Sequence, residues 1–399
     1  MKRNWMLFLI CFILSFTLAG CWNRRELNQI GIVSAMGIDK LGNQYLVTIQ
    51  FVNPGEVATQ KGGANRAAIT TYQDQGSTIE QAIRRMSTIA PRKSYYSHLQ
   101  MLIIGEELAK NGVGKTLDFL SRDHELRTDF YIAVAKSQRA EDILNILTPV
   151  EKIPSQNLFS KLENSDKVWA ATGTIKLDEM MSNLMSKGKE PVLTGIQVIG
   201  NQSIGGTQKN VQFANPPAKL KYTHMAVFRR DKLIGWLNEK ESIGYNWTQS
   251  GHTHSTVFNV PAPKHALIGV EIVRTKTQTK GMIKHGKPQF DIDIQAEGNI
   301  GEVQSDVDMT KTKTIEDIQK KAEQDIVDKV ERAIKKAKAY KADIFGFGEV
   351  IHRTDPKTWK QIKNHWEKQE FAKAAVTVHA NVKIRRVGTV NNSFLKEME

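Results

Sequence analysis

The length of its apolar runs is what most constrains this chain. One run near the start, from Trp5 to Leu18, follows the positively charged stretch Met1-Lys2-Arg3. It is shorter than the about 20 apolar residues that a membrane-spanning helix needs, so it is typical of a cleavable signal. Later apolar runs, such as 101–104, have only the length of a strand. We therefore expect a signal peptide over residues 1–20 and then a folded body that does not cross a membrane.

The apolar run ends in Leu18-Ala19-Gly20-Cys21, which resembles the lipobox of bacterial lipoproteins. In that class of protein the cysteine sulfur is alkylated with diacylglycerol, and cleavage makes the cysteine the mature N-terminus. The resemblance implies that Cys21 is the lipid attachment site and that the body lies on the extracytoplasmic face of a membrane. Two acyl chains anchor a protein stably, because each buried CH₂ contributes about 0.8 kcal/mol. The alternative is an uncleaved N-terminal anchor in the same membrane.

The composition suits a folded extracytoplasmic protein. The 399 residues are 40% hydrophobic and 25% charged, which is enough for two or three domains. Because Cys11 lies in the signal, the mature chain has only Cys21 and no thiol left for disulfides, metal binding or nucleophilic catalysis. The net charge of +14 falls by two, to +12, without Lys2 and Arg3. That charge fits anionic lipid, an acidic partner or simple solubility, whereas nucleic acid is a poor partner outside the cytoplasm.

Strands and helices alternate in the first part of the chain, so we predict an N-terminal α+β domain over 21–150 with a mixed sheet. Ser77 is expected to cap a helix, with Glu80 at the capping-box position. Periodicity and turn residues predict the other elements. These are a hairpin from 30 to 52 with its turn at 40–43, strands at 68–72, 99–104 and 130–135, and helices near 106–110, 116–124 and 140–147.

The pattern is weaker over residues 151–220. A helix is expected at 177–185 and a strand at 192–199. Residues 201–217 are rich in Gly, Asn, Gln and Pro, which is typical of a long loop or linker. We interpret this region as a small middle domain or as an excursion from the first domain.

A C-terminal α+β domain is predicted over 221–390, followed by a frayed tail at 391–399. Its strands are a hairpin at 225–237 and the segments 266–275, 290–296 and 376–384. Apolar and polar residues alternate in the last two segments, so one face of their sheet is expected to be in water.

The strongest predicted helix begins near Thr314, with Asp317 at its capping-box position. Another helix begins at Asp355-Pro356, a cap followed by a proline at the first helical position. Apolar residues at helical spacing mark the buried sides of the two helices. They are Ile315, Ile318, Ala322, Ile326, Val330, Ile334 and Ala337 in the first, and Trp359, Ile362 and Trp366 in the second.

Three motifs resemble parts of a phosphate, zinc or catalytic carboxylate site, but each has a simpler structural explanation or lacks a required residue. Residues 112–116, Gly-Val-Gly-Lys-Thr, resemble the end of a phosphate-binding loop, but Ala109 occupies the position of its first glycine. We expect a turn between two helices there. His252 and His254 have no nearby third ligand for zinc. Strand alternation explains Asp291 and Asp293. A catalytic pair of carboxylates that are distant in the sequence but close in the fold remains an alternative. No catalytic, metal or cofactor residue is predicted.

Glycine and aromatic residues combine in Asp343-Ile344-Phe345-Gly346-Phe347-Gly348, directly after the long predicted helix. Glycines suit a helix stop followed by a close turn, and the phenylalanines can fill the core beneath it. A structural role is therefore favoured over a ligand site. The segment Leu233–Leu237 is expected to be part of the core for the same reason.

Together these segments resemble the C subunits of spore germinant receptors, the Ger(x)C (GerAC-like) lipoprotein family. The resemblance runs along nearly the whole mature chain, and only the combination of motifs is specific. The motifs are Cys21-Trp22-Asn23-Arg24-Arg25-Glu26-Leu27, Gly31-Ile32-Val33, Met36-Gly37-Ile38-Asp39, the hairpin 228–237, the motif 343–348, Trp359, Trp366 and the terminal strand.

The resemblance implies three domains, each a mixed or antiparallel sheet with surrounding helices. It implies a lipid-anchored, non-enzymatic protein on the outer face of the inner spore membrane. There it would act with membrane-embedded A and B subunits to detect nutrients and trigger germination. Only Cys21 receives a defined role, lipid attachment. Two other functions stay open: a lipid-anchored solute-binding protein, and a cell-wall hydrolase whose acids or metal ligands meet in a cleft.

Overall fold

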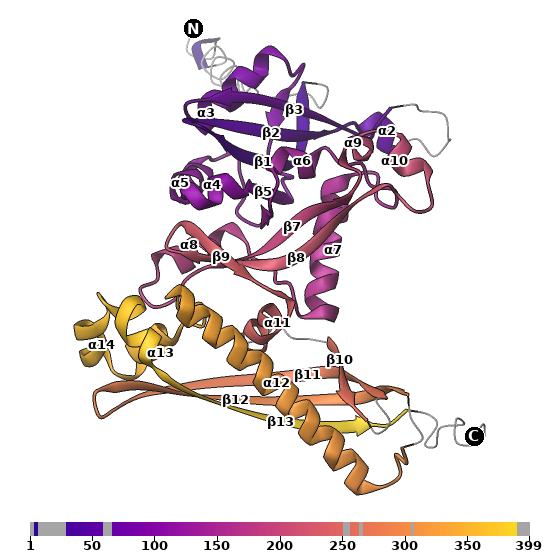
Figure 1. The fold of residues 1–399 in the computed structure, drawn as a ribbon. Coiled ribbons are helices and arrows are strands. Elements are labelled where there is room, and N and C mark those ends of the chain that lie inside the picture. Colours follow the sequence, from indigo (N-terminus) through magenta and orange to yellow (C-terminus); the bar gives the residue numbers. More distant parts are fainter. Residues whose placement is uncertain are drawn as a thin grey trace.

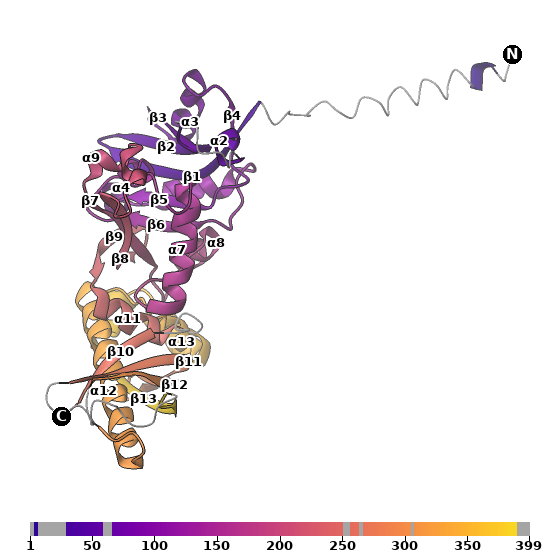
Figure 2. The ribbon, with the colours of Figure 1, turned by 90° about the vertical axis from the view of Figure 1, so that its right-hand side faces the viewer.

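The computed structural model describes residues 4–6, 29–58, 66–249, 256–262, 266–304 and 307–388. They form an elongated molecule with one sheet at each end (Figure 1, Figure 2). We call the end with the first strands the N-terminal lobe and the other end the C-terminal lobe. The combination of mixed sheets and helices confirms the predicted α+β class. Cys21, His252, His254 and the tail at 391–399 lie outside the described residues.

The sheet of the N-terminal lobe is large and mixed. Its strands are β1 (Ile30–Leu41), β2 (Gln44–Val52), β3 (Ile69–Gly76), β4 (Lys93–Tyr95), β5 (Met101–Gly105), β6 (Tyr131–Ala135), β7 (Val192–Gly200), β8 (Ala218–Arg229) and β9 (Lys232–Leu237). The order is β3-β2-β1-β5-β6-β7-β8-β9, and β4 pairs with β1. Pairing is parallel from β1 through β5 and β6 to β7 and antiparallel on both sides of this block.

Helices cover both faces of the large sheet, so its central strands are buried on two sides and are almost wholly apolar. In β1, Ala35 faces one apolar core and Met36 the other. The helices against the Met36 side are α3 (Ile79–Arg85), α4 (Glu106–Asn111), α5 (Gly114–Arg122) and α8 (Leu177–Met185), and those against the Ala35 side are α6 (Ala140–Leu144) and α7 (Pro154–Trp169). Short helices α2 (Pro54–Ala58), α9 (Gln202–Gly205) and α10 (Lys209–Gln212) lie in connections.

The C-terminal lobe has a four-stranded sheet of order β10-β11-β12-β13. The strands are β10 (Thr256–Pro261), β11 (Leu267–Lys284), β12 (Lys287–Val303) and β13 (Ala375–Arg386), and only the β12–β13 pair is parallel. One face carries α11 (Glu239–Thr248), the long α12 (Thr312–Tyr340) and α13 (Phe347–Thr354) (Figure 1). Between α13 and β13 the chain forms α14 (Pro356–Ile362), a π-helical turn (Trp366–Glu370) and α15 (Phe371–Lys373).

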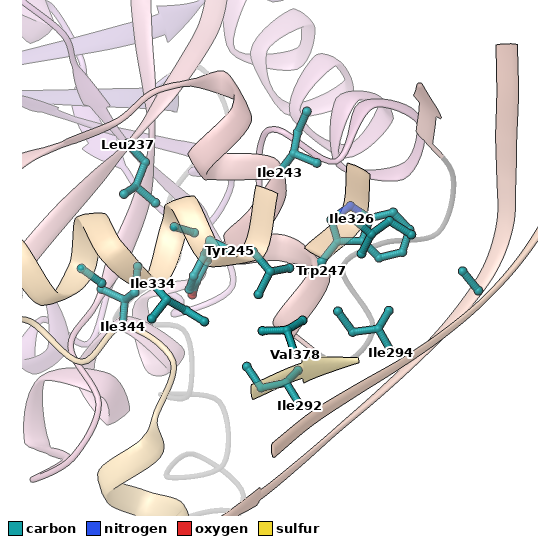
Figure 3. Close-up of a cluster of buried hydrophobic side chains, with 14 of the residues drawn as sticks. Leu237, Ile243, Tyr245, Trp247, Ile292, Ile294, Ile326, Ile334, Ile344 and Val378 are labelled. Carbon is teal, nitrogen blue, oxygen red and sulfur yellow. The ribbon is translucent and has the colours of Figure 1, made fainter. Parts of the chain in front are cut away.

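The core of the C-terminal lobe continues into the N-terminal lobe. Ile294 of β12, Ile326 of α12 and Trp247 of α11 lie in this buried cluster (Figure 3). The cluster also contains Val192, Met225, Val227 and Leu237, which belong to the large sheet. The core of the C-terminal lobe therefore extends across the junction, while the N-terminal sheet has two further cores of its own.

The number of sheets differs from the expectation. We expected a sheet in each of three domains, but β7, β8 and β9 extend the N-terminal sheet. The hairpin assigned to the C-terminal domain thus pairs with a strand of the middle region. The physical reason is that backbone pairing joins distant segments, whereas periodicity reports only local structure. The boundaries 21–150, 151–220 and 221–390 stay predictions.

Local signals predicted several elements correctly. The buried positions of α12 include every residue of the predicted stripe except Ile315, which is partly buried. Asp355 caps α14 by accepting a hydrogen bond from the Thr358 amide, with Pro356 at the first helical position. The predicted helix at 177–185 and the strand from 192 are α8 and β7. Helix α7, which lies in the weakly patterned region, was not predicted.

Three predicted helix ends were wrong. Thr78 caps α3 in place of Ser77, because the Thr78 hydroxyl is the group that accepts from the Gln81 amide, at 3.1 Å. Helix α12 already begins at Thr312, so Thr314 lies inside its first turn. Its other end is at Lys341, in the left-handed region with φ 51°, and not at a glycine.

In the described part of the chain, no helix is both long and apolar enough to cross a membrane.

Candidate functional site

The best-defined polar site lies where the two lobes meet, at the loop between α12 and α13. This loop carries the motif from Asp343 to Gly348. Gly346, with φ 76°, begins α13 in the left-handed region, where a side chain would be strained. Phe347 is fully buried and Phe345 is partly buried, so the expected core role of these rings is confirmed.

Asp343 is completely buried and holds the motif together. Its Oδ2 accepts hydrogen bonds from the Gly348 amide at 2.8 Å and from Trp366 Nε1 at 2.9 Å. Its Oδ1 accepts from the Phe345 amide at 3.2 Å. Burying a carboxylate is costly unless such donors replace water. The three N–H donors therefore explain how an ionised group can sit in this core.

The backbone of Asp343 connects the motif to two other segments. Its carbonyl accepts from the Glu190 amide at 2.8 Å, and its amide donates to Glu367 Oε2 at 2.7 Å. Close to these bonds Gly188 packs against Gly348; a Cβ built on Gly348 would lie 2.6 Å from Gly188 Cα. The segment before β7 is therefore held directly on the motif of the C-terminal lobe.

Glu190, Asp343 and Glu367 form a carboxyl cluster in the junction. Burial raises the pKa of Glu190 to about 7, although the Arg230 amide hydrogen-bonds to its carboxylate. Burial and the neighbouring Asp343 charge raise the pKa of Glu367. Burial also raises the pKa of Asp343, but its N–H donors favour the charged form. We infer that Asp343 is the ionised member and that Glu367 retains its proton near neutral pH.

A cleft of about 380 Å³ lies beside the motif, between the lobes. Its lining includes Glu179, Lys189, Glu349 and Arg353, together with the Phe345 ring. Ser186 Oγ donates to Glu349 Oε1 at 2.6 Å. The volume lies in the range of small-molecule sites, and charges of both signs suit a polar ligand. Among the described residues, no group of three or more His, Cys, Asp or Glu could hold a metal ion.

Residues 112 and 113 form the turn between α4 and α5, as expected, and residues 114–116 form the first turn of α5. The Val113 amide donates to the Asp231 carbonyl at 2.8 Å, and the Gly114 amide donates to Asp231 Oδ2 at 3.3 Å. A Cβ on Gly112 would lie 2.6 Å from Asp231 Oδ2. The β8–β9 turn thus occupies the amides that a phosphate would need.

The other acidic residues that the sequence singled out are structural or solvent-exposed. Asp39 is buried, and its two carboxylate oxygens accept from the Ala140 and Glu141 amides at 2.8 and 3.0 Å, which caps α6. Asp291 and Asp293 alternate with buried residues of β12, as predicted. Asp293 pairs with Lys280 at 3.7 Å on the solvent side of the sheet.

Sequence reasoning missed Glu190 and Glu367 as partners of Asp343. Neither belongs to a motif, and both reach Asp343 only through tertiary packing. The glycines at 188 and 348 are the one sequence signal for this contact, since close backbone approach requires them. Cys21, the single residue for which a role was predicted, lies outside the described residues, so lipid attachment stays a prediction.

Two family models match the chain. One, "Spore germination protein N-terminal domain", matches residues 23–198, and the other, "Spore germination B3/ GerAC like, C-terminal", matches residues 223–388. Spore germination protein KC of Bacillus subtilis (strain 168) is 31% identical over 98% of both chains. Spore germination protein B3 of the same strain is 26% identical over 96% of this chain and 98% of its own length.

A solved structure, the crystal structure of the GerBC protein, shares the fold. Its TM-score is 0.54 at 21% identity, over 88% of this chain and 96% of that chain. The second matched segment covers the C-terminal lobe and also β9 and part of β8, which belong to the N-terminal sheet. With a relative above 30% identity along its whole length, the chain belongs to the GerAC-like family of spore germination proteins.

Proposed function

We propose that the chain is the lipid-anchored, non-enzymatic C subunit of a nutrient germinant receptor. In this proposal Cys21 carries the lipid, and the body lies on the outer face of the inner spore membrane. It acts there with A-type and B-type membrane subunits to trigger germination. The observation that carries the proposal is the relationship to spore germination proteins along the full chain, combined with Leu18-Ala19-Gly20-Cys21 at its start.

The carboxyl cluster of the junction has the surroundings of a structural site. The carboxyl cluster is engaged by backbone amides and by the Trp366 indole, so it stabilises the fold. Catalysis by a carboxyl pair would instead require two acids that face a substrate. Asp291 and Asp293 lie on a polar strand face opposite Lys280 and Gln278.

Deleting the gene and measuring nutrient-triggered germination tests this proposal. We expect spores that lack the protein to lose the response to at least one nutrient, and expression of the wild-type gene to restore it. Germination by a route that bypasses nutrient receptors should be unchanged, which controls for general damage to the spore. A normal response to every nutrient in a strain without a related receptor gene would refute the proposal.

The cleft at the lobe junction favours a second candidate, a lipid-anchored protein that binds a small solute. A ligand at 100 times its Kd would stabilise the protein by about 2.7 kcal/mol. Thermal unfolding in the presence of amino acids and sugars therefore discriminates between the two functions. A saturable increase in Tm that Arg353→Ala abolishes would favour solute binding, since Arg353 lines the cleft.

A further inference from the structure

We propose that the uncovered face of the four-stranded sheet docks an acidic surface of another protein. We call it the open face and define it by Arg274, Lys276, Gln278, Lys280 and Lys284 of β11, Asp291, Asp293, Gln295 and Glu297 of β12, and His379, Asn381, Lys383 and Arg385 of β13. The inference rests on the proposed function in one respect: it identifies the partner as a membrane subunit of the receptor.

The first observation is that no helix in the described part of the chain packs on this face. In β12, Phe290, Ile292 and Ile294 are buried, whereas the side chains between them point the other way. Helices α11, α12 and α13 all contribute to the core on the buried side. Figure 1 shows α12 running across that side of the sheet. A sheet face without helices is normally in water.

The second observation is an imbalance of charge across the strands. The register places Arg274 opposite Glu297, and Glu297 beside Lys383 on β13. Arg385 donates to Glu297 Oε1 at 2.7 Å, and this hydrogen bond lowers the pKa of Glu297. Three cations therefore surround one carboxylate. Like charges on neighbouring strands repel one another, so this arrangement costs stability in the isolated protein.

The surplus cations converge on a hollow in the open face. A depression of about 300 Å³ is lined by Arg274, Lys276, Glu297 and Lys383. Lys276 and Lys383 form no ion pair with any residue that the structure describes. A carboxylate brought into this hollow by a partner would relieve the repulsion. Charge complementarity of this kind chiefly sets specificity and association rate.

At the β13 edge the sheet does not offer strand addition as an alternative mode of binding. The backbone amides of Val382 and Ile384, at the outer edge of β13, donate to Glu323 Oε1 and Gln319 Oε1 of α12 at 3.0 and 2.9 Å. These bonds occupy donors that an added strand would need. The partner is thus expected to contact side chains of the open face.

The test uses the full-length protein in spores that also contain the other receptor subunits. A photo-crosslinking amino acid replaces Gln278, an exposed residue of the open face that the register places opposite Asp293. The control site is Glu331, an exposed residue of α12 on the other side of the sheet. We expect a crosslink from position 278 to an acidic extracytoplasmic segment of a membrane subunit, located by mass spectrometry, and none from position 331.

A charge variant tests the role of the cations. Combining Arg274→Gln, Lys276→Gln, Lys383→Gln and Arg385→Gln should reduce the crosslink on the order of tenfold. The matched control removes the same charge from exposed α12 residues, as Lys313→Gln, Lys320→Gln, Arg332→Gln and Lys335→Gln, and should leave the yield unchanged. Circular dichroism establishes that both variants fold.

The outcomes separate this inference from the proposed function. Crosslinks from position 278 only to phospholipid, or equal yields in the two charge variants, would overturn the docking surface. The docking surface would also be overturned if no crosslink formed in spores whose nutrient response still requires the gene. That result would leave the proposed function intact. If the nutrient response does not require the gene, the proposed function fails, and a crosslink to an acidic protein would still support the open face.

Discussion

The indole Nε1 of Trp366 donates a hydrogen bond of 2.9 Å to the carboxylate of Asp343, and both side chains are buried. This pair joins the loop after α12 to the π-helical turn that precedes β13. The same carboxylate also holds the first turn of α13 through the Gly348 amide. Because the Asp343 backbone reaches Glu190 as well, one residue connects the packing of the C-terminal lobe to its contact with the N-terminal lobe.

Asp343→Ala should therefore be one of the most damaging substitutions in the chain. It leaves the Gly348 amide and the Trp366 indole without acceptors in a buried site, which costs about 3 kcal/mol or more. The loss can be measured by urea denaturation followed by tryptophan fluorescence. Asp355→Ala is the matched control, since it removes a partly exposed helix cap and should cost only about 1 kcal/mol. Equal losses for the two variants would contradict the account.

Glu190 should make stability depend on pH. Its pKa is raised from 4.5 to about 7, mainly by burial, so the folded state binds its proton more tightly than the unfolded state. The stability that this proton supplies is complete below about pH 4.5 and is lost as the pH rises to about 7. Glu190→Gln keeps a neutral side chain and removes this titration. We expect its free energy of unfolding to fall less than that of the wild type between pH 5 and pH 7; parallel curves would show that Glu190 is not the group responsible.

Gly244 should be required for the crossing of α11 and α12. A Cβ at this position would lie 2.0 Å from the Lys329 carbonyl oxygen, so Gly244→Ala forces the two helices apart. We expect a destabilisation of about 2–3 kcal/mol and a lower Tm. Gly55→Ala is the control, because a Cβ there meets nothing within 4 Å and α2 tolerates alanine. A Tm for Gly244→Ala equal to that of Gly55→Ala would mean that the helices separate without cost.

Elements with a strong local signal were predictable. The stripe of α12, the alternation of β12 and β13 and the cap at Asp355 all depend on residues within a few positions of one another. The core role of Phe347 was predictable in the same way, from its place beside two glycines after a long helix.

The arrangement of those elements was not predictable. Nothing local shows that β7 pairs with β6 and thereby joins the middle region to the N-terminal sheet. The carboxyl cluster is a stronger example, because Glu190 and Glu367 come from different lobes and lack any motif. Helix α7 was missed because its buried side includes the polar residues Ser155 and Asp166, which interrupt the apolar pattern.

The central claim is that a lipid on Cys21 holds a germinant receptor subunit at the membrane. The most direct measurement is the distribution of full-length Cys21→Ala between the membrane and soluble fractions of spores, made together with nutrient-triggered germination. The account predicts that the variant folds, leaves the membrane fraction and fails to support germination, while the wild type remains in that fraction. A Cys21→Ala protein that stays in the membrane fraction and supports a normal nutrient response would contradict it.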